Sequence, residues 1–222
     1  MRLTIADKAS VVTAFGNVGL KVGPRKGPNR RTTFQKEAYN LRQYLTTLAD
    51  HDLLSYPLEV AKSERPDFLL CDPVNGRCGL EVTEATTRSH NRWLTETEGE
   101  EGEEGADLLP GDAWVGNSAE RECCAAVVRA ANRKARSIGK SGYTPAARYD
   151  LLLYINARAF FYFEEEMAEM LLNKARRWVA HWNRSGKLGK VSAITNDSLL
   201  YDLAGNTRTL PLSHPVKPSL EE

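Results

Sequence analysis

Hydrophobic and polar positions recur along the chain with two different periods. From Thr33 to Leu48, apolar residues return every three or four positions, which indicates an amphipathic helix. Two short apolar runs flank the turn-forming segment DPVNG at 72–76 and therefore predict a hairpin. The continuous apolar run Tyr149–Ala157 predicts a buried central strand, because a strand covered on both faces has no solvent-facing positions.

Other segments of the chain also have the hydrophobic pattern of a helix or a strand. We expect a strand at 58–62, helices at Ser118–Ile138 and Glu164–Arg184, and closing strands at 191–196 and 198–203. Helices that alternate with strands in this order predict an α/β fold, in which a central mixed sheet is flanked by helices on both faces.

The chain of 222 residues, 41% of them hydrophobic, is long enough for one domain with a substantial core. We therefore expect a single domain over 1–222. It would carry a basic N-terminal arm at 1–31, an acidic flexible loop at 95–113 and an unstructured tail at 211–222. Between Lys8 and Lys36 the sequence has seven basic residues and no acidic one, whereas the loop holds six Glu and two Asp.

The overall charge indicates neither a nucleic-acid nor a membrane partner, because 30 Lys and Arg nearly balance 29 Asp and Glu. No run approaches the roughly 20 apolar residues that span a bilayer, and the N-terminus lacks the order of a signal peptide. We therefore expect a cytoplasmic protein with no membrane partner. Local basic clusters are candidates for phosphate contacts that weaken with salt. These are the N-terminal arm and the helix that carries Arg129, Arg133, Lys134 and Arg136.

Acidic residues stand out within the predicted hairpin. In a strand, residues two apart share a face, so Glu81 and Thr83 should face one side while Leu80 and Val82 point into the core. The neighbouring strand can bring Asp67 close to Glu81, and two carboxylates about 5 Å apart repel by roughly 3 kcal/mol at an effective dielectric constant of 20. A Mg²⁺ ion would remove that repulsion. The alternative is an ordinary hairpin with charged residues on its solvent face.

Two other glutamates need separate explanations. Glu84 should face away from Glu81 by strand alternation, so we expect it to be an ion-pair partner rather than a metal ligand. Glu37 lies on the apolar stripe of the first helix, where a carboxylate is costly to bury without a partner. It either contributes to the site or pairs with a buried arginine.

The hairpin resembles the motif of the PD-(D/E)xK nuclease superfamily, which has the restriction-endonuclease-like fold. In that motif a Pro-Asp pair, here Pro66 and Asp67, is followed on the next strand by Glu or Asp, any residue and Lys. The sequence GLEVT at Gly79–Thr83 occupies the second position. The order of elements from Thr33 to about Asp202 is similar to the common core of the family.

The resemblance implies a Mg²⁺- or Mn²⁺-dependent nuclease that hydrolyses phosphodiester bonds, with DNA as the expected substrate and RNA as the alternative. Asp67 and Glu81 would be the metal ligands. Glu37 would assist, because the N-terminal helix of this fold often contributes an acidic residue. Many nucleases of this fold act as dimers, so the resemblance also allows a homodimer.

One residue departs from the motif: Thr83 stands where the family has lysine, which orients the attacking water and stabilises transition-state charge. A neighbouring helix sometimes supplies the missing group in this family. We name Lys134 as that residue, with the Thr83 hydroxyl as a second candidate for orienting the water, and Lys62 and Lys140 as weaker alternatives for the lysine. Lys134 shares a helix stripe with apolar residues, which would direct it inward. Alternatively, it lies at the helix C-terminus and extends into solvent.

Two functions follow from these observations. The first is an active nuclease in which Lys134 replaces the motif lysine. The second is a catalytically inactive relative that keeps the fold as a nucleic-acid-binding or protein-interaction module. The position of the Lys134 ammonium relative to Asp67 and Glu81 discriminates between them.

Overall fold

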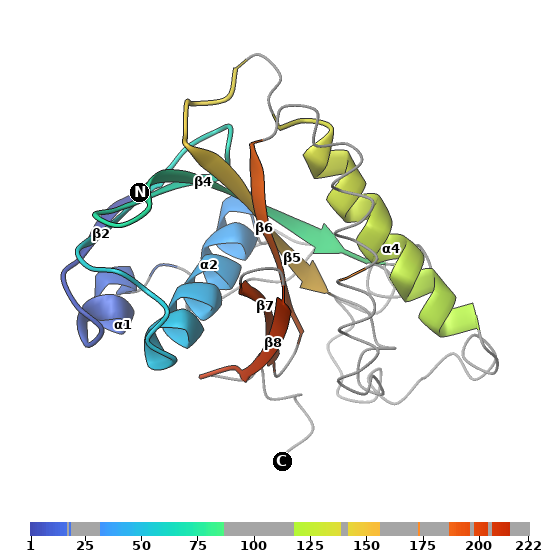
Figure 1. Ribbon diagram of the computed structural model, residues 1–222, viewed down its shortest axis with the longest axis horizontal. Helices are drawn as coiled ribbons and strands as arrows, with labels where there is room; N and C mark the ends of the chain where they lie inside the picture. The colour runs from blue at the N-terminus through green and yellow to red at the C-terminus, as the bar shows by residue number, and fades with distance from the viewer. Residues whose placement is uncertain are drawn as a thin grey trace.

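The computed structural model describes residues 1–16, 18, 32–86, 118–138, 142–155, 173, 187–195, 198–203 and 206–213. Within these ranges the strands form one sheet whose spatial order follows the chain, from β1 at one edge to β8 at the other (Figure 1). The strands are β1 (Arg2–Ile5), β2 (Leu58–Lys62), β3 (Phe68–Asp72), β4 (Gly76–Ala85), β5 (Arg148–Ile155), β6 (Leu188–Ile194), β7 (Ser198–Leu203) and β8 (Asn206–Pro211).

The sheet is mixed, as the sequence predicts. Strands β1 to β4 pair antiparallel, β4, β5 and β6 pair parallel, and β6 to β8 pair antiparallel. The predicted hairpin is confirmed: β3 and β4 pair from Phe68 opposite Leu80 to Asp72 opposite Gly76. The predicted central strand is also confirmed, because β5 lies between β4 and β6, and Leu152 is completely buried.

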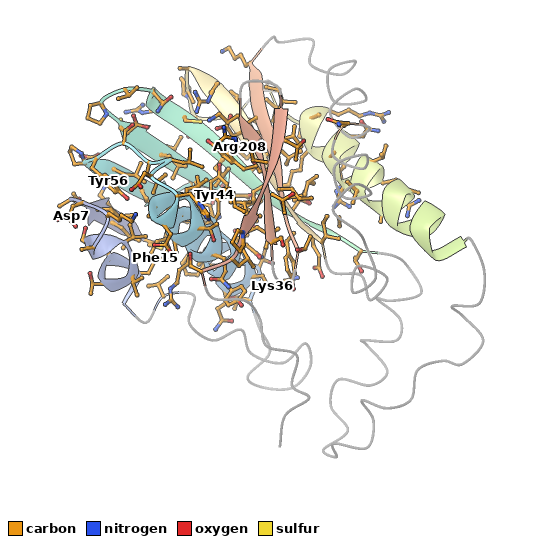
Figure 2. All side chains as sticks on the ribbon, turned by 60° about the horizontal axis from the view of Figure 1, so that its bottom comes forward. Asp7, Phe15, Lys36, Tyr44, Tyr56 and Arg208 are labelled. Atoms are coloured by element: carbon orange, nitrogen blue, oxygen red, sulfur yellow. The ribbon has the colours of Figure 1, made fainter. Side chains whose placement is uncertain are left out.

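The described helices are α1 (Ser10–Phe15), α2 (Thr33–Asp50) and α4 (Ser118–Ala135). Helix α2 begins where the sequence predicts, because the Thr32 hydroxyl accepts from the Gln35 N–H and the Gln35 side chain accepts from the Thr32 N–H. Helices α2 and α4 cover opposite faces of the sheet (Figures 1 and 2). On the α2 side, the rings of Tyr44 and Tyr201 of β7 lie 6.3 Å apart, centroid to centroid.

Strand alternation decides what β4 offers to each helix. Leu80 and Val82 are buried in the core cluster that also contains residues of α2. Glu81 and Thr83 face the other side, where their side chains contact residues of α4. The predicted division of β4 into an apolar face and a polar face is therefore confirmed, and the polar face is covered by a helix rather than exposed to solvent.

Three short elements were not predicted. Strand β1 and helix α1 lie within the segment expected to be a basic arm, so at least residues 2–5 and 10–15 belong to the fold. Strand β8 pairs with β7 and reaches Pro211, the first residue of the predicted tail. Elements of four to six residues show too few repeats of a period to be recognised, so only their pairing partners reveal them.

Other predictions fall on residues outside the described ranges. These are the acidic loop at 95–113, the helix at 164–184 except Asn173, Lys140, and most of the arm and of the tail. Two of the basic residues at the start of the chain are described and form ion pairs, Lys8 with Asp52 and Lys36 with Glu84. Among the helices that are described, none has the length and apolar character needed to cross a membrane.

Candidate functional site

The hairpin places Asp67 beside Glu81. Asp67 directly precedes β3, and because Phe68 pairs with Leu80, Asp67 lies next to Glu81 of β4. Gly79 makes this arrangement possible, since a Cβ atom at that position would lie 2.8 Å from Cγ of Pro66, closer than real side chains approach. The glycine of GLEVT therefore leaves room for the proline that precedes Asp67.

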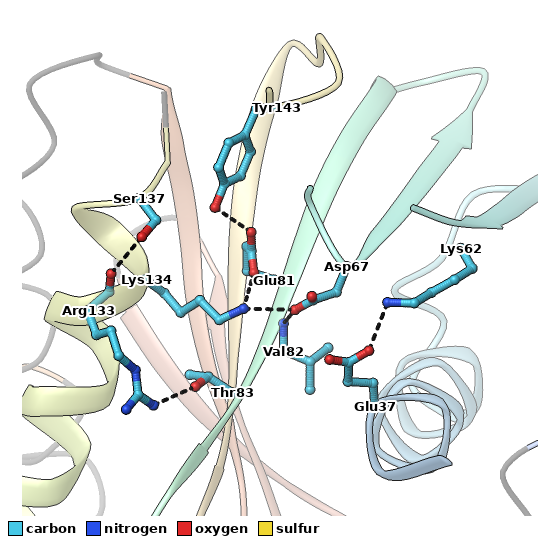
Figure 3. Close-up of polar contacts among 10 residues, drawn as sticks. All are labelled: Glu37, Lys62, Asp67, Glu81, Val82, Thr83, Arg133, Lys134, Ser137 and Tyr143. Atoms are coloured by element: carbon cyan, nitrogen blue, oxygen red, sulfur yellow. Dashed lines mark hydrogen bonds and ion pairs between the residues drawn. The ribbon is translucent and has the colours of Figure 1, made fainter. Parts of the chain in front are cut away.

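Lys134 of α4 lies between the two carboxylates. Its Nζ atom is 3.1 Å from Oδ2 of Asp67 and also contacts Oε2 of Glu81 (Figure 3). Helix α4 buries Val127 and Ala131 against the sheet, and this packing directs Lys134 inward. The predicted inward orientation is confirmed, and the alternative in which the ammonium extends into solvent is wrong.

Two further donors fix the carboxylates. The N–H of Val82 donates to Oδ2 of Asp67 at 2.8 Å, and the hydroxyl of Tyr143 donates to Oε1 of Glu81 at 2.5 Å (Figure 3). Both oxygens of Glu81 are thus held by a donor. Oδ1 of Asp67 accepts no hydrogen bond from any residue in the described part of the chain.

Tyr143 is the functional residue that the sequence did not reveal. It lies in the segment that leads into β5, and its backbone is held because the Thr144 N–H donates to the Arg65 carbonyl oxygen at 2.7 Å. Its ring makes an edge-to-face contact with Tyr149 at 5.4 Å between centroids. Gly142, with φ of +94°, supplies the backbone conformation that begins this segment. A lone tyrosine in such a loop carries no periodic signal.

The electrostatics of the site follow from burial and from the paired acids. Burial raises the pKa of Glu81, and the negative charge of Asp67 raises it further. Burial opposes a charged Lys134, but the two carboxylates outweigh that effect and raise its pKa above the usual value for lysine. Burial and the contact with Glu81 also raise the pKa of Tyr143. Lys134 and Tyr143 are therefore both hydrogen-bond donors at neutral pH.

Thr83, which stands where the motif has lysine, accepts a hydrogen bond from a side chain of α4. Nη2 of Arg133 donates to the Thr83 hydroxyl at 3.3 Å (Figure 3). Adjacent residues of α4 therefore bring two cations to the polar face of β4, Lys134 to the carboxylates and Arg133 to Thr83.

Glu37 and Glu84 have different positions. Glu37 pairs with Lys62 at 2.8 Å, so its partner is a lysine rather than the arginine we considered. Burial raises the pKa of Glu37, the hydrogen bond from Lys62 opposes the rise, and the charge of Asp67 adds to it. The charge of Asp67 therefore affects Glu37, although Glu37 contacts neither carboxylate of the site. Lys62 is the ion-pair partner of Glu37. Glu84 pairs with Lys36 at 3.2 Å, which confirms its prediction as an ion-pair residue.

These side chains surround a cleft of about 420 Å³. Its lining consists of Glu64, Arg65, Asp67, Glu81, Arg133, Lys134, Ser137 and Tyr143. Two carboxylates suit Mg²⁺, which takes one or two protein oxygens and completes its shell with water and phosphate oxygens. In the described part of the chain, no group of three or more His, Cys, Asp or Glu side chains forms a closed metal cage. The two carboxylates supply the oxygens that a hard cation would use here, and Oδ1 of Asp67 is the one of them that accepts no hydrogen bond from a described residue.

Compared with known proteins, the chain matches no protein-family model, no curated protein and no solved structure. A resemblance to the PD-(D/E)xK nucleases therefore has no support beyond the hairpin residues Pro66, Asp67 and Glu81 and the side chains around them.

Proposed function

We propose that this protein is a metal-dependent nuclease of the PD-(D/E)xK type that hydrolyses phosphodiester bonds in DNA. The observation that carries the proposal is the position of Lys134. The residue comes from a helix distant in sequence, yet its ammonium lies at both carboxylates of the hairpin. A lysine beside the acid pair is what the motif requires, and Thr83 cannot supply one.

Each side chain has a role in this proposal. Asp67 and Glu81 would hold Mg²⁺ or Mn²⁺, and the ion would polarise the phosphate and lower the pKa of an attacking water. Lys134 is a fixed, protonated donor that orients the nucleophile and stabilises developing negative charge. The Val82 N–H and Tyr143 set the orientation of the two carboxylates, so little reorganisation is needed during reaction.

The order of elements supports a restriction-endonuclease-like core. Helix α2 precedes the β2, β3 and β4 meander, and α4 connects β4 to the parallel strand β5. The acid pair lies on the meander, Glu37 comes from the preceding helix, and the lysine comes from the crossover helix. The acids thus lie on the elements that the proposed family uses, whereas the lysine comes from a helix instead of from β4.

A catalytically inactive relative was the competing function, because Thr83 replaces the motif lysine. The placement of Lys134 favours an active enzyme. If α4 directed Lys134 into solvent, no lysine would contact the two carboxylates.

The proposal is tested by incubating the protein with plasmid, linear and single-stranded DNA and with RNA, in Mg²⁺ or Mn²⁺. Wild type should cleave a DNA substrate, and Asp67→Ala and Glu81→Ala should abolish cleavage. Cleavage that survives both substitutions would refute the proposed site. Folding of each variant should be verified by circular dichroism.

A further inference from the structure

Two arginines of the cleft have no acidic partner among the residues that the structure describes. Arg65 and Arg133 both line the cleft and are exposed. Within the described ranges neither guanidinium forms an ion pair, and the Arg133 guanidinium donates a side-chain hydrogen bond only to the uncharged Thr83. Five cations of the described fold pair with carboxylates, namely Lys8, Lys36, Lys62, Lys134 and Arg148. Others, such as Arg77 and Arg208, form no ion pair within the described ranges, but they lie outside the cleft. The cleft therefore holds two guanidinium groups whose charge is free for an anionic ligand.

The two arginines lie at opposite ends of the acid pair. The carbonyl oxygen of Arg65 accepts from Thr144, and its Nη1 atom lies 3.8 Å from the place a Cβ on Gly142 would take, so Arg65 belongs to the end marked by Tyr143. Arg133 belongs to the other end, at Thr83. Figure 3 shows Tyr143 and the contact between Arg133 and Thr83 on either side of Lys134 and Glu81. Two residues of a strand, from Glu81 to Thr83, cover about 6.6 Å.

A guanidinium recognises phosphate through several N–H donors in one plane, and each arginine here has donors to spare. A ligand with a single phosphate, held at the acid pair as the reacting group, offers no further phosphate to either arginine. A ligand with phosphates in series can reach both. Recognition of successive phosphates by the two arginines extends the proposed nuclease function and rests on it.

We propose that the cleft binds one nucleic-acid strand along β4, with Arg65 and Arg133 each contacting a phosphate on either side of the phosphodiester held at Asp67 and Glu81. The ligand is a strand with consecutive phosphates, not a mononucleotide. Thr83 holds the Arg133 guanidinium in position for this contact.

The experiment measures binding rather than cleavage. A fluorescently labelled single-stranded DNA oligonucleotide is titrated with the Asp67→Asn protein at several salt concentrations, so that the strand stays intact. The slope of log affinity against log salt should become shallower by about 0.7 in Arg65→Gln, by about 0.7 in Arg133→Gln, and by about 1.4 in the double variant. Arg133→Lys, which keeps the charge, should preserve the slope. Inorganic phosphate should compete far more weakly than unlabelled oligonucleotide.

The matched control is Arg208→Gln, an equal charge change at an exposed residue of β8, four strands and about 19 Å away across the sheet. It should leave the slope unchanged. An equal slope change in Arg208→Gln, or none in either cleft variant, would overturn the inference, as would failure of the protein to bind the oligonucleotide. Salt-sensitive binding through both arginines without cleavage by wild type in Mg²⁺ would support the strand site and refute the proposed hydrolysis. Cleavage by wild type, with salt slopes that neither arginine substitution changes, would support the proposed hydrolysis and refute the strand site.

Discussion

The ammonium of Lys134 lies 3.1 Å from Oδ2 of Asp67, a residue 67 positions earlier in the chain. The contact joins the crossover helix α4 to the start of β3 across the sheet. Since Lys134 also contacts Glu81, one cation balances part of the charge of an acid pair that would otherwise be strongly repulsive. The two carboxylates and the lysine therefore form one connected cluster of ion pairs.

Removing the lysine should remove most of the activity. Lys134→Ala is expected to lower the single-turnover rate of DNA cleavage by about 100- to 1,000-fold, because a fixed donor to developing charge is lost. Lys134→Arg should retain part of the rate, since charge and donors remain. The measurement is cleavage at saturating protein in Mg²⁺, with unfolding in urea as the check on folding.

Restoring the motif lysine tests whether the helix residue replaces it. Thr83 shares the polar face of β4 with Glu81, so the double variant Lys134→Ala with Thr83→Lys would place an ammonium at the position the family uses. We expect it to cleave at least about tenfold faster than Lys134→Ala alone, which corresponds to about 1.4 kcal/mol of recovered transition-state stabilisation. Equal rates in the two variants would argue against the exchange of roles.

Tyr143 should control the acidic limb of the pH profile. Burial and Asp67 raise the pKa of Glu81 above 4.5, whereas the hydrogen bond from Tyr143 lowers it by stabilising the carboxylate. Glu81 must be ionised to hold a cation, so activity falls as pH drops through its pKa. Tyr143→Phe removes the opposing contact, and the acidic limb of kcat/KM should move to higher pH.

The control for this shift is Tyr39→Phe, which removes a hydroxyl from α2 outside the cleft. Its acidic limb should coincide with that of wild type. A limb that moves to lower pH in Tyr143→Phe, or does not move, would show that the tyrosine does not act on Glu81.

Glu37 should tune metal affinity without being essential. Its charge and that of Asp67 interact unfavourably, and the pair with Lys62 holds it near the site. Glu37→Gln removes a negative charge that attracts the cation, so the Mg²⁺ concentration for half-maximal rate should rise by about tenfold. Glu59→Gln, at an exposed position of β2, is the matched control and should leave that concentration unchanged. A complete loss of activity in Glu37→Gln would instead make Glu37 a metal ligand.

The stability of the sheet should depend on β5. Leu152 is completely buried at its centre, so Leu152→Ala should lower the free energy of unfolding by about 2–5 kcal/mol. Val74→Ala removes methyl groups from a turn residue that is 77% exposed and should cost less than about 0.5 kcal/mol. Urea unfolding measures both. Similar unfolding midpoints for the two variants would contradict the position of β5 in the core.

The features that the sequence revealed are those encoded by local period. Alternation in β4 separated Glu81 and Thr83 from Leu80 and Val82, and the helix stripe of α4 directed Lys134 inward. Both orientations follow from the face on which the neighbouring apolar residues lie.

What the sequence did not reveal depends on contacts between distant segments. Tyr143 can donate to Glu81 because the segment that carries it is hydrogen-bonded to the backbone of Arg65. Glu37 pairs with Lys62 because the fold brings β2 close to α2. Strand β1 and helix α1 are recognisable from their packing against β2 and α2, not from their few residues. Tertiary partners of this kind leave no periodic trace in the chain.

The most direct test of the account compares two glutamates on the same strand. Glu81→Gln and Glu84→Gln make the same chemical change three residues apart on β4, one beside Asp67 and Lys134 and the other in an ion pair with Lys36. In Mg²⁺, Glu81→Gln should lower the single-turnover rate of DNA cleavage by about 100-fold or more, because the proposed ion, which stabilises transition-state charge by several kcal/mol, would lose a ligand. Glu84→Gln should cleave at nearly the wild-type rate. Equal rates for Glu81→Gln and wild type would contradict the proposed catalytic site.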